Sequence, residues 1–356
     1  MTGATPTPAT QHSWPELLTG LIAGRDLTQD EASWAMGEIL QGEATPSQVA
    51  GFAVALRAKG ETVDELNGLV GAMYDHALPL QLEGRWLDVV GTGGDRSMSV
   101  NISTMAALVA AGAGVRVAKH GNRSASSKAG AADVLESLGI RLDLSPDQVA
   151  GTGVEVGITF CFAPAFHPAL RHAAVPRREL GVATAFNFLG PLAHPGRPAA
   201  QAIGCADSRM APLMAAVLAR RGVDAWVFRG DDGLDELTTT TTSSVWAVHD
   251  GAVEQFSLDP AEVGLDRGTA EGLRGKDAAY NAGVVERVLA GEPGQVRDAV
   301  LLNAGAALAV HAADEGDVLS WLRHGVDRAR EAVDSGAAAA LLERWRDHTA
   351  SLGEAP

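Results

Sequence analysis

Two apolar runs, each followed directly by a polar, glycine-rich segment, constrain the fold of this chain most strongly. Residues 86–90 lead into Gly91-Thr92-Gly93-Gly94-Asp95, and residues 115–118 lead into Lys119-His120-Gly121-Asn122-Arg123. Open α/β sheets place their ligand sites in such loops, at the carboxyl ends of parallel strands. The two segments therefore predict an α/β fold with a binding site where two strands end.

Strand-like runs alternate with helical patterns from residue 86 onward, which is typical of a mostly parallel sheet covered by helices. We expect strands at 86–90, 115–118, 158–162, 200–204 and 223–228, and a hairpin over 245–256 with Asp250-Gly251 as its turn. Helices are expected at 100–111, 131–138, 208–221, 277–290, 294–311, 316–334 and 337–350. The pattern predicts a larger α/β domain made of 83–167 and 193–350.

The chain before residue 83 has a helical pattern and no strand-like run. Three capping boxes recur there: Thr28 with Glu31, Thr45 with Gln48, and Thr62 with Glu65. We predict a small all-helical domain over 12–82, with 168–192 packing on it. Residues 1–11 and 351–356 are expected to be tails, the first disordered and without the basic and apolar regions of a signal peptide.

Composition limits the classes of partner. The net charge of −16 opposes binding to nucleic acid or to an anionic membrane through the overall field. An anionic small substrate would need a locally basic pocket, which Lys119, His120, Arg123 and Lys128 could supply. The two cysteines, Cys161 and Cys205, have no metal-ligand spacing, and we expect a cytoplasmic protein with reduced thiols.

Three segments carry candidate chemistry for a polyphosphate. Asn101, Ser103 and Thr104 open a predicted helix whose first N–H groups can bind an anion, although the preceding Gly-Thr-Gly-Gly could be only a tight turn. The segment from Lys119 combines charge with many small donors, although a basic loop is often merely solvated. Asp235-Glu236 could hold Mg²⁺ beside substrate phosphates, although adjacent carboxylates usually lie on the surface.

These motifs occur in an order that resembles anthranilate phosphoribosyltransferases. The resemblance rests on the motifs above, on 162–167 (FAPAFH), 177–181 (RRELG) and 186–192 (FNFLGPL), and on 233–237 (GLDEL). It implies a glycosyltransferase of tryptophan biosynthesis, in which anthranilate and 5-phosphoribosyl 1-diphosphate (PRPP) give N-(5-phosphoribosyl)anthranilate and diphosphate. It also implies an active site between a helical and an α/β domain, and a homodimer formed through the helical domain.

The resemblance assigns residues position by position. It implies that PRPP is contacted by Gly91, Gly94, Asp95, Ser99, Asn101, Ile102, Ser103, Thr104, Lys119, His120, Gly121, Asn122, Arg123, Ser124, Ala125, Ser126, Ser127 and Ala131. It implies two Mg²⁺ per subunit, held by Ser103, Asp235 and Glu236. Gly91, Asn122 and Arg177 would contact anthranilate, and His167 would lie near its entry path.

The chain departs from the family pattern at three places. Ala131 replaces a serine, which removes one hydroxyl contact to phosphate. Pro176 precedes Arg177 and removes a backbone donor, and His194 stands where the family usually has asparagine.

Two alternatives remain. A pyrimidine nucleoside phosphorylase would share the fold and the Lys119 segment, but it needs no metal-binding pair such as Asp235-Glu236. A non-catalytic homologue that binds nucleic acid would need a basic surface, which the net charge opposes.

Overall fold

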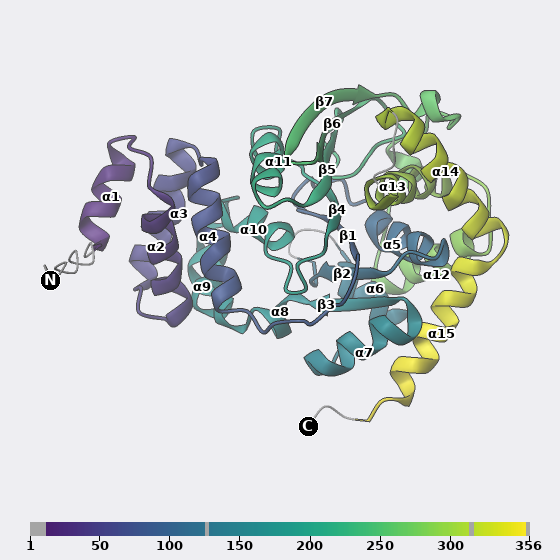
Figure 1. Cartoon of the computed structure of the whole chain (residues 1–356), viewed down its shortest axis with the longest axis horizontal. Helices are drawn as coiled ribbons and strands as arrows, with labels where there is room; N and C mark the ends of the chain where they lie inside the picture. Colours follow the sequence, from purple (N-terminus) through teal and green to yellow (C-terminus); the bar gives the residue numbers. More distant parts are fainter. Residues whose placement is uncertain (1–11, 125–127, 313–316, 354–356) are drawn as a thin grey trace, which may run out of the picture. The chain divides into compact units, whose positions relative to one another are not determined.

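A computed structural model describes residues 12–124, 128–312 and 317–353, and its contacts divide the chain into two compact units (Figure 1). The smaller unit runs to His76 and includes Ala169–Ala185, and the larger unit contains Ala77–Pro168 and the chain from Phe186 onward. Compact units defined by contacts are not the same as autonomous domains. The domain boundaries given above therefore stay a prediction.

The smaller unit is a helical bundle. Its helices are α1 (Trp14–Ile22), α2 (Gln29–Gln41), α3 (Pro46–Lys59), α4 (Val63–Asp75) and α9 (Arg171–Leu180). The three capping boxes predicted from the sequence are confirmed at the starts of α2, α3 and α4. Buried Glu65 also accepts a hydrogen bond from Leu27 N at 2.8 Å and pairs with Lys59 at 3.0 Å, so a single cap residue joins three segments.

The larger unit contains a seven-stranded sheet in the order β3-β2-β1-β4-β5-β6-β7. Its strands are β1 (Leu87–Gly91), β2 (Val117–Gly121), β3 (Ile158–Phe162), β4 (Ala200–Gly204), β5 (Asp224–Gly230), β6 (Ser243–His249) and β7 (Ala252–Leu258). The first five are parallel, β6 is antiparallel to β5, and β7 is antiparallel to β6. Asp250 and Gly251 form the predicted turn, with φ of 48° and 74°. The predicted fold class is confirmed.

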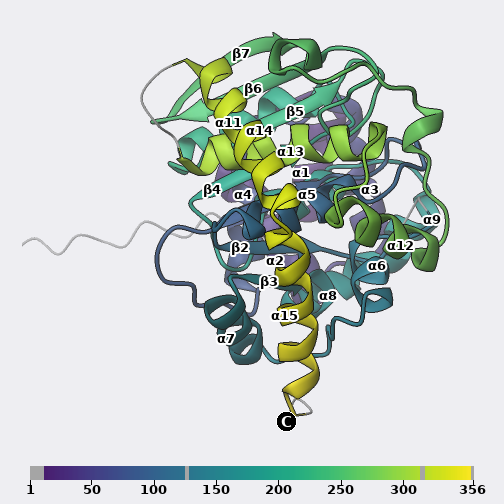
Figure 2. The same cartoon turned by 90° about the vertical axis from the view of Figure 1, so that its right-hand side faces the viewer.

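Helices cover both faces of this sheet. Helices α5 (Ile102–Gly112) and α13 (Gln295–Ala312) pack on one face, and α11 (Met210–Arg220) packs on the other (Figure 1). The remaining helices are α6 (Ala131–Ser137), α7 (Pro146–Val156), α8 (Ala163–Phe166), α10 (Phe186–Leu192), α12 (Ala278–Leu289), α14 (Val318–Asp334) and α15 (Ala337–Ser351). Figure 2 shows α14 and α15 outside α13 and α5, which they contact. None of the helices in the described ranges is long and apolar enough to cross a membrane.

Alternation along the strands separates two chemical environments. Leu87 and Val89 of β1 join the core below α5 and α13, whereas Trp86 joins a smaller cluster on the opposite face. Asp88 follows the same period and points to the face of Trp86. On β2, Val117 belongs to the first core and Ala118 to the second cluster. Lys119 and His120 are therefore directed to opposite faces of the sheet.

The chain leaves β1 for β2 on one side, whereas β4 lies on its other side, which makes the β1–β4 boundary the switch point of the sheet. Ligands of open α/β sheets bind outside the carboxyl ends of the strands at such a point. Gly91 and Gly204 end these two strands as register partners. The fold thus places the loop after β1 where a ligand site is expected.

Candidate active site at the carboxyl ends of β1, β2 and β4

The predicted metal-binding pair lies against the glycine-rich loop and the first turn of α5, within the larger unit. Asp235 Oδ2 accepts a hydrogen bond from Gly93 N at 2.6 Å, and Glu236 Oε1 accepts one from Ser103 N at 3.1 Å. The two residues are only 9% and 7% exposed. The surface interpretation of this acidic pair is therefore wrong, and three segments that are distant in sequence form one site.

The negative charges of Asp235 and Glu236 are only partly compensated by nearby cations and donors. Burial raises the pKa of Asp235 well above its ordinary value, and the neighbouring carboxylates of Asp95 and Glu236 raise it further. Burial also raises the pKa of Glu236 to about 7, although Lys119 and hydrogen bonds from Ser103 act in the opposite direction. Asp95 Oδ2 is buried without a hydrogen-bond partner among the described residues. Such a group of oxygen donors fits a hard divalent cation.

The protein supplies only part of a coordination shell. Within the described ranges, no three His, Cys, Asp or Glu side chains are arranged as a metal site. Mg²⁺ commonly takes one or two carboxylates and completes its shell with water and substrate phosphates. The Asp235–Glu236 pair with the nearby Ser103 hydroxyl fits that pattern.

Lys119 brings a buried cation to the same place. Its side chain is directed to the face of α5, where Nζ donates to Val89 O at 2.5 Å and to Ser103 Oγ at 3.4 Å. The residue is 2% exposed, and burial lowers the pKa of Lys119 while Asp88, Glu236 and Asp235 raise it. The predicted basic site thus contains a cation beside the carboxylates rather than a solvated lysine.

Strands β1 and β2 separate toward the site. Among the described residues, their registered pairing is limited to Leu87 and Val117. Side chains then meet the backbone groups that a longer ladder would use: Lys119 Nζ donates to Val89 O at 2.5 Å, His194 Nε2 to Ala118 O at 2.7 Å, and His120 N to Asp88 Oδ1 at 3.0 Å. The opening therefore leaves these three backbone groups hydrogen-bonded.

Three histidines of the larger unit lie together on the opposite face. The ring centroid of His120 is 5.6 Å from that of His167 and 5.4 Å from that of His194. Burial lowers the pKa of His167 to about 4 and that of His120 well below its ordinary value. Nε2 of both rings is buried without a hydrogen-bond partner among the described residues. Both imidazoles are therefore neutral at pH 7 and can accept a donor from a ligand.

The segment after β2 is held by its own ion pairs. Arg123 pairs with Asp133 at 2.9 Å and with Glu136 at 2.5 Å, and its guanidinium lies 5.6 Å from the centroid of the Phe162 ring. The contact of Arg123 with PRPP stays a prediction, and a phosphate would compete with the carboxylates of Asp133 and Glu136 for the guanidinium. Ser124 N donates to Asp133 Oδ2 at 3.3 Å. Ala125, Ser126 and Ser127 lie outside the described residues.

The other predicted contacts occupy distinct places. The end of β1 and the loop after it contain Gly91, Gly94, Asp95 and Ser99, and the start of α5 contains Asn101, Ile102, Ser103 and Thr104. The end of β2 contains Gly121 and Asn122, and α6 begins at Ala131. Asn101 Nδ2 donates to Ala129 O at 3.1 Å, which joins the starts of α5 and α6. Arg177 is half-buried on α9 of the smaller unit. All the other predicted contacts among the described residues belong to the larger unit.

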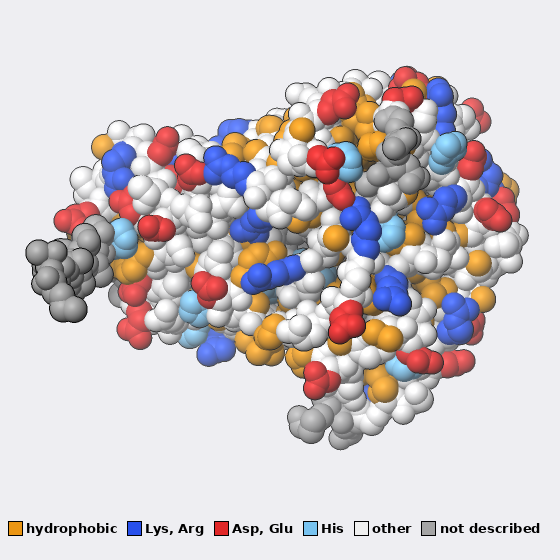
Figure 3. Space-filling model, viewed as in Figure 1, with side chains coloured by type: hydrophobic (Ala, Val, Ile, Leu, Met, Phe, Trp, Pro, Cys, Tyr) orange, Lys and Arg blue, Asp and Glu red, His pale blue; other side chains and the backbone are white. Residues whose placement is uncertain are grey.

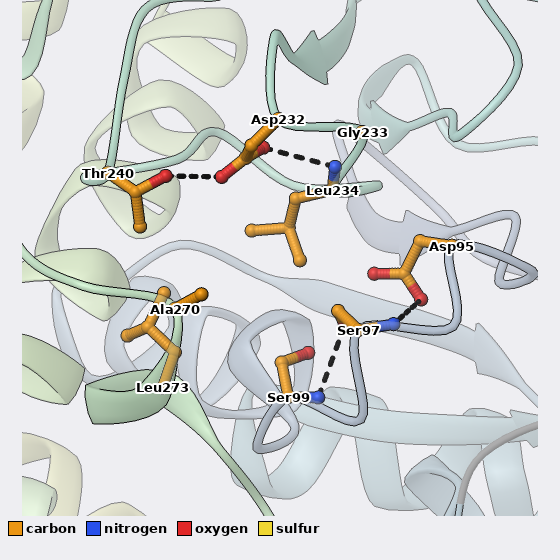
Figure 4. Close-up of a pocket in the computed structure, with 9 residues that line it drawn as sticks. All are labelled: Asp95, Ser97, Ser99, Asp232, Gly233, Leu234, Thr240, Ala270 and Leu273. Carbon is orange, nitrogen blue, oxygen red and sulfur yellow. Dashed lines mark hydrogen bonds between the residues drawn. The ribbon is translucent and has the colours of Figure 1, made fainter.

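A pocket of about 190 Å³ adjoins the loop after β1 (Figure 4). It is lined by Asp95, Ser97, Ser99, Asp232, Gly233, Leu234, Thr240, Ala270 and Leu273. Figure 4 shows Leu234 between the Asp232–Thr240 pair and the Asp95–Ser97 turn. The pocket shares Asp95 and Ser99 with the predicted PRPP contacts and belongs to the same site.

Comparison of the chain with known proteins identifies its family. Residues 83–339 match the α/β domain of a glycosyl transferase family, and residues 15–77 match its helical bundle domain. The anthranilate phosphoribosyltransferases of a Nocardioides species and of Thermobifida fusca are 68% and 58% identical, over 95% and 94% of this chain and 99% and 96% of theirs. The chain belongs to the anthranilate phosphoribosyltransferase family.

Solved structures of this family agree. The enzyme from Thermus thermophilus has a TM-score of 0.88 and 42% identity, covering 94% of this chain and 99% of its own. The Saccharomyces cerevisiae enzyme in complex with PRPP and Mg has a TM-score of 0.86 and 27% identity, covering 95% and 98%.

Several residues of the candidate site are missing from the contacts predicted from the sequence. Asp88 lies inside an apolar strand pattern, Gly204 ends another, and Asn303 lies within the apolar pattern of a long helix. All three are fixed by contacts distant in sequence, such as that of Asn303 with Leu237. A buried polar residue within an apolar pattern is the signal that could have identified Asp88 and Asn303.

Glu236 predicts a pH-dependent stability in the absence of metal. A carboxyl group whose folded pKa is about 7, against an ordinary 4.5, stabilises the fold when protonated, and this contribution is lost as the pH rises from about 5 to about 8. We therefore expect the free energy of unfolding of the wild type, measured with denaturant in chelator, to fall between these pH values. In Glu236→Gln this fall should be smaller, by up to about 3 kcal/mol. Exposed Glu254→Gln is the control, and parallel curves for wild type and Glu236→Gln would contradict this assignment.

Proposed function

We propose that this chain transfers the 5-phosphoribosyl group of PRPP to the amine of anthranilate, giving N-(5-phosphoribosyl)anthranilate and diphosphate in tryptophan biosynthesis. The observation that carries the proposal is the convergence of Asp235 and Glu236 with Gly93 and Ser103, beside buried Lys119. Loop N–H groups, a cation and metal-binding carboxylates are together what a diphosphate leaving group requires. Membership of the family supplies the two substrates.

The leaving group determines the chemistry. The bond from ribose C1 to a diphosphate oxygen breaks, its electron pair stays on diphosphate, and the sugar becomes more positive. We assign PRPP to the loop after β1, to the start of α5 and to segment 119–131, with Asp235, Glu236 and Ser103 as holders of two Mg²⁺. Bound Mg²⁺ would neutralise the departing charge, while Lys119 and the backbone N–H groups are fixed before the reaction begins.

The acceptor needs orientation more than activation. The aromatic amine is neutral at pH 7, forms the bond to C1 through its own electron pair, and releases a proton to solvent afterwards. We assign the carboxylate of anthranilate to Arg177, because a guanidinium can bind it in a bidentate manner. Gly91 and Asn122 would line its position, and neutral His167 its entry path. A positioned amine gains rate by proximity without a strong general base.

The decisive assay follows the fluorescence of anthranilate with PRPP and Mg²⁺. We expect loss of anthranilate fluorescence that depends on PRPP, and at least a roughly 100-fold slower reaction in chelator, on the order expected when a leaving group loses its counter-charge. Pyrimidine nucleoside with inorganic phosphate should give no base release, since activity there would favour a phosphorylase. Figure 3 shows acidic and basic side chains interspersed on the visible face, which gives no support to nucleic-acid binding, and no gel shift is expected.

Arg177→Ala tests the carboxylate contact. Loss of a charge-assisted hydrogen-bond pair should raise the KM for anthranilate roughly 10- to 100-fold, with a smaller fall in kcat, because the interaction is made in the ground state and the transition state alike. The KM for PRPP should stay within about twofold. Exposed Arg178→Ala is the matched control on the same helix. An unchanged KM for anthranilate would remove Arg177 from the site.

We also propose a cytoplasmic homodimer formed through the helical unit. Ile22 of α1 and Val54 of α3 are 80% and 44% exposed on two helices that pack together, and a second copy of the chain could cover both side chains. Light scattering should give twice the monomer mass for the wild type and the monomer mass for the double variant Ile22→Glu/Val54→Glu. Val154→Glu, at an exposed valine of α7, should remain dimeric. A monomeric wild type would refute the proposal.

A further inference from the structure

Gly204 lies directly below the backbone of Asp235. A Cβ atom on Gly204 would overlap the carbonyl oxygen and carbon of Asp235, and it would lie 3.2 Å from Glu236 N. Gly204 does not have a positive φ, so its backbone conformation alone does not require glycine. The obstacle is backbone, which cannot turn away as a side chain can. The absence of a side chain at Gly204 therefore lets the carboxylate pair reach the strand ends.

The register partner of Gly204 has the same relation to the side chain of Asp235. A Cβ atom on Gly91 would meet Asp235 Oδ2, and it would lie 3.2 Å from both Cγ and the carbonyl oxygen of that residue. The two glycines end adjacent parallel strands at the switch point. Together they form a floor on which Asp235 rests, with its Oδ2 within 2.6 Å of Gly93 N.

Asn303 of α13 holds the other side of the pair. Its side chain is fully buried, Oδ1 accepts from Leu237 N at 2.9 Å, and Nδ2 donates to Leu237 O at 2.8 Å. The amide thus binds both backbone groups of the residue that follows Glu236, as a neighbouring strand would. Nδ2 also donates to Ala299 O at 2.9 Å, which fixes the amide to its own helix.

The flanks of the pair are joined to each other. Asp232 accepts from Thr238 Oγ1 at 2.8 Å and also from Thr240 Oγ1 (Figure 4). Segments on both sides of the pair therefore form one closed loop. Within that loop, Asn303 and Gly204 reach the backbone next to the carboxylates from α13 and β4.

We propose that Gly204 and Asn303 are positioning residues that set the divalent-cation affinity of the Asp235–Glu236 pair. Neither is assigned a contact with substrate, and each acts through the backbone that carries a metal-binding carboxylate. The inference rests on the proposed function, because it concerns the same metal site. Supporting contacts of this kind typically change metal affinity about 10- to 100-fold when they are removed.

The test measures Mn²⁺ binding in the presence of PRPP by electron paramagnetic resonance, together with the Mg²⁺ dependence of transfer. Gly204→Ala and Asn303→Leu should each weaken Mn²⁺ binding at least about tenfold and raise the Mg²⁺ concentration for half-maximal activity by a similar factor, and excess Mg²⁺ should restore much of kcat. This recovery by Mg²⁺ separates displaced ligands from a general loss of folded protein.

Two control variants match these changes away from the site. Gly151 lies within α7 with open space around its Cβ position, so Gly151→Ala matches Gly204→Ala. Thr349 is fully buried and its hydroxyl accepts from Arg141 N and donates to Arg346 O, so Thr349→Val removes the same kinds of hydrogen bond as Asn303→Leu. Both controls should bind Mn²⁺ within about twofold of wild type, on the scale of ordinary distant substitutions.

Each outcome is decisive. Wild-type Mn²⁺ affinity in both Gly204→Ala and Asn303→Leu would overturn the inference while leaving the function intact, and so would equal losses in the controls. If Gly204→Ala does not fold, Asn303→Leu decides the test, because it removes both hydrogen bonds to the backbone of Leu237 without adding an atom at the strand ends. A wild type that binds Mn²⁺ with PRPP but transfers nothing to anthranilate would refute the proposed function instead.

Discussion

Two adjacent carboxylates are buried where parallel strands end, and the surroundings of the site follow from that constraint. Burying like charges is unfavourable unless donors or cations compensate them. Gly93 N and Ser103 N each donate one hydrogen bond to the pair, and Lys119 adds one buried positive charge. These contacts hold the carboxyl groups in place, but they do not supply enough positive charge to keep both ionised, since the pKa of Asp235 stays well above its ordinary value. The remaining charge is what a divalent cation can balance.

The separation of β1 from β2 gives one short strand two functions. Successive residues of a strand point to opposite faces, so Lys119 reaches the carboxylates below α5 while His120 joins the histidine cluster on the other face. A continuous ladder would bring the two backbones together, whereas here side chains satisfy the freed groups. Asp88 holds the backbone N–H of His120 at 3.0 Å, which fixes the point where the two functions separate. The proposed phosphate site and the histidine cluster therefore each take one residue from β2.

Local sequence patterns predict the helices, strands and turns of this fold, but they do not predict the contacts between residues that are distant in sequence. The three capping boxes and the Asp250-Gly251 turn depend on neighbours within four residues, so the sequence alone predicts them. The apolar pattern predicts a strand at 115–118, whereas β2 spans Val117–Gly121, because Lys119 and His120 are polar yet buried and interrupt that pattern. Arg123 illustrates the same limit, since its partners Asp133 and Glu136 lie 10 and 13 residues away. Gly204 has no local pattern, and Asn303 is marked only as a polar residue in an apolar helix pattern, because the contacts of both are made with the folded backbone of 235–237.

The overall charge of −16 is compatible with an anionic substrate because the charges that matter are local. Exposed charges more than about 8 Å away are largely screened at physiological ionic strength, whereas buried groups interact strongly. At the site, Asp235 and Glu236 lie near buried Lys119, and Asp95 adds a further negative charge beside Asp235, so neither the bare pair nor a bare diphosphate is balanced there. A divalent cation bound by the pair would balance both, since its remaining coordination positions could take phosphate oxygens. In the proposed site, affinity for the cation and affinity for PRPP would be reciprocal, and residues that position the carboxylates would affect both.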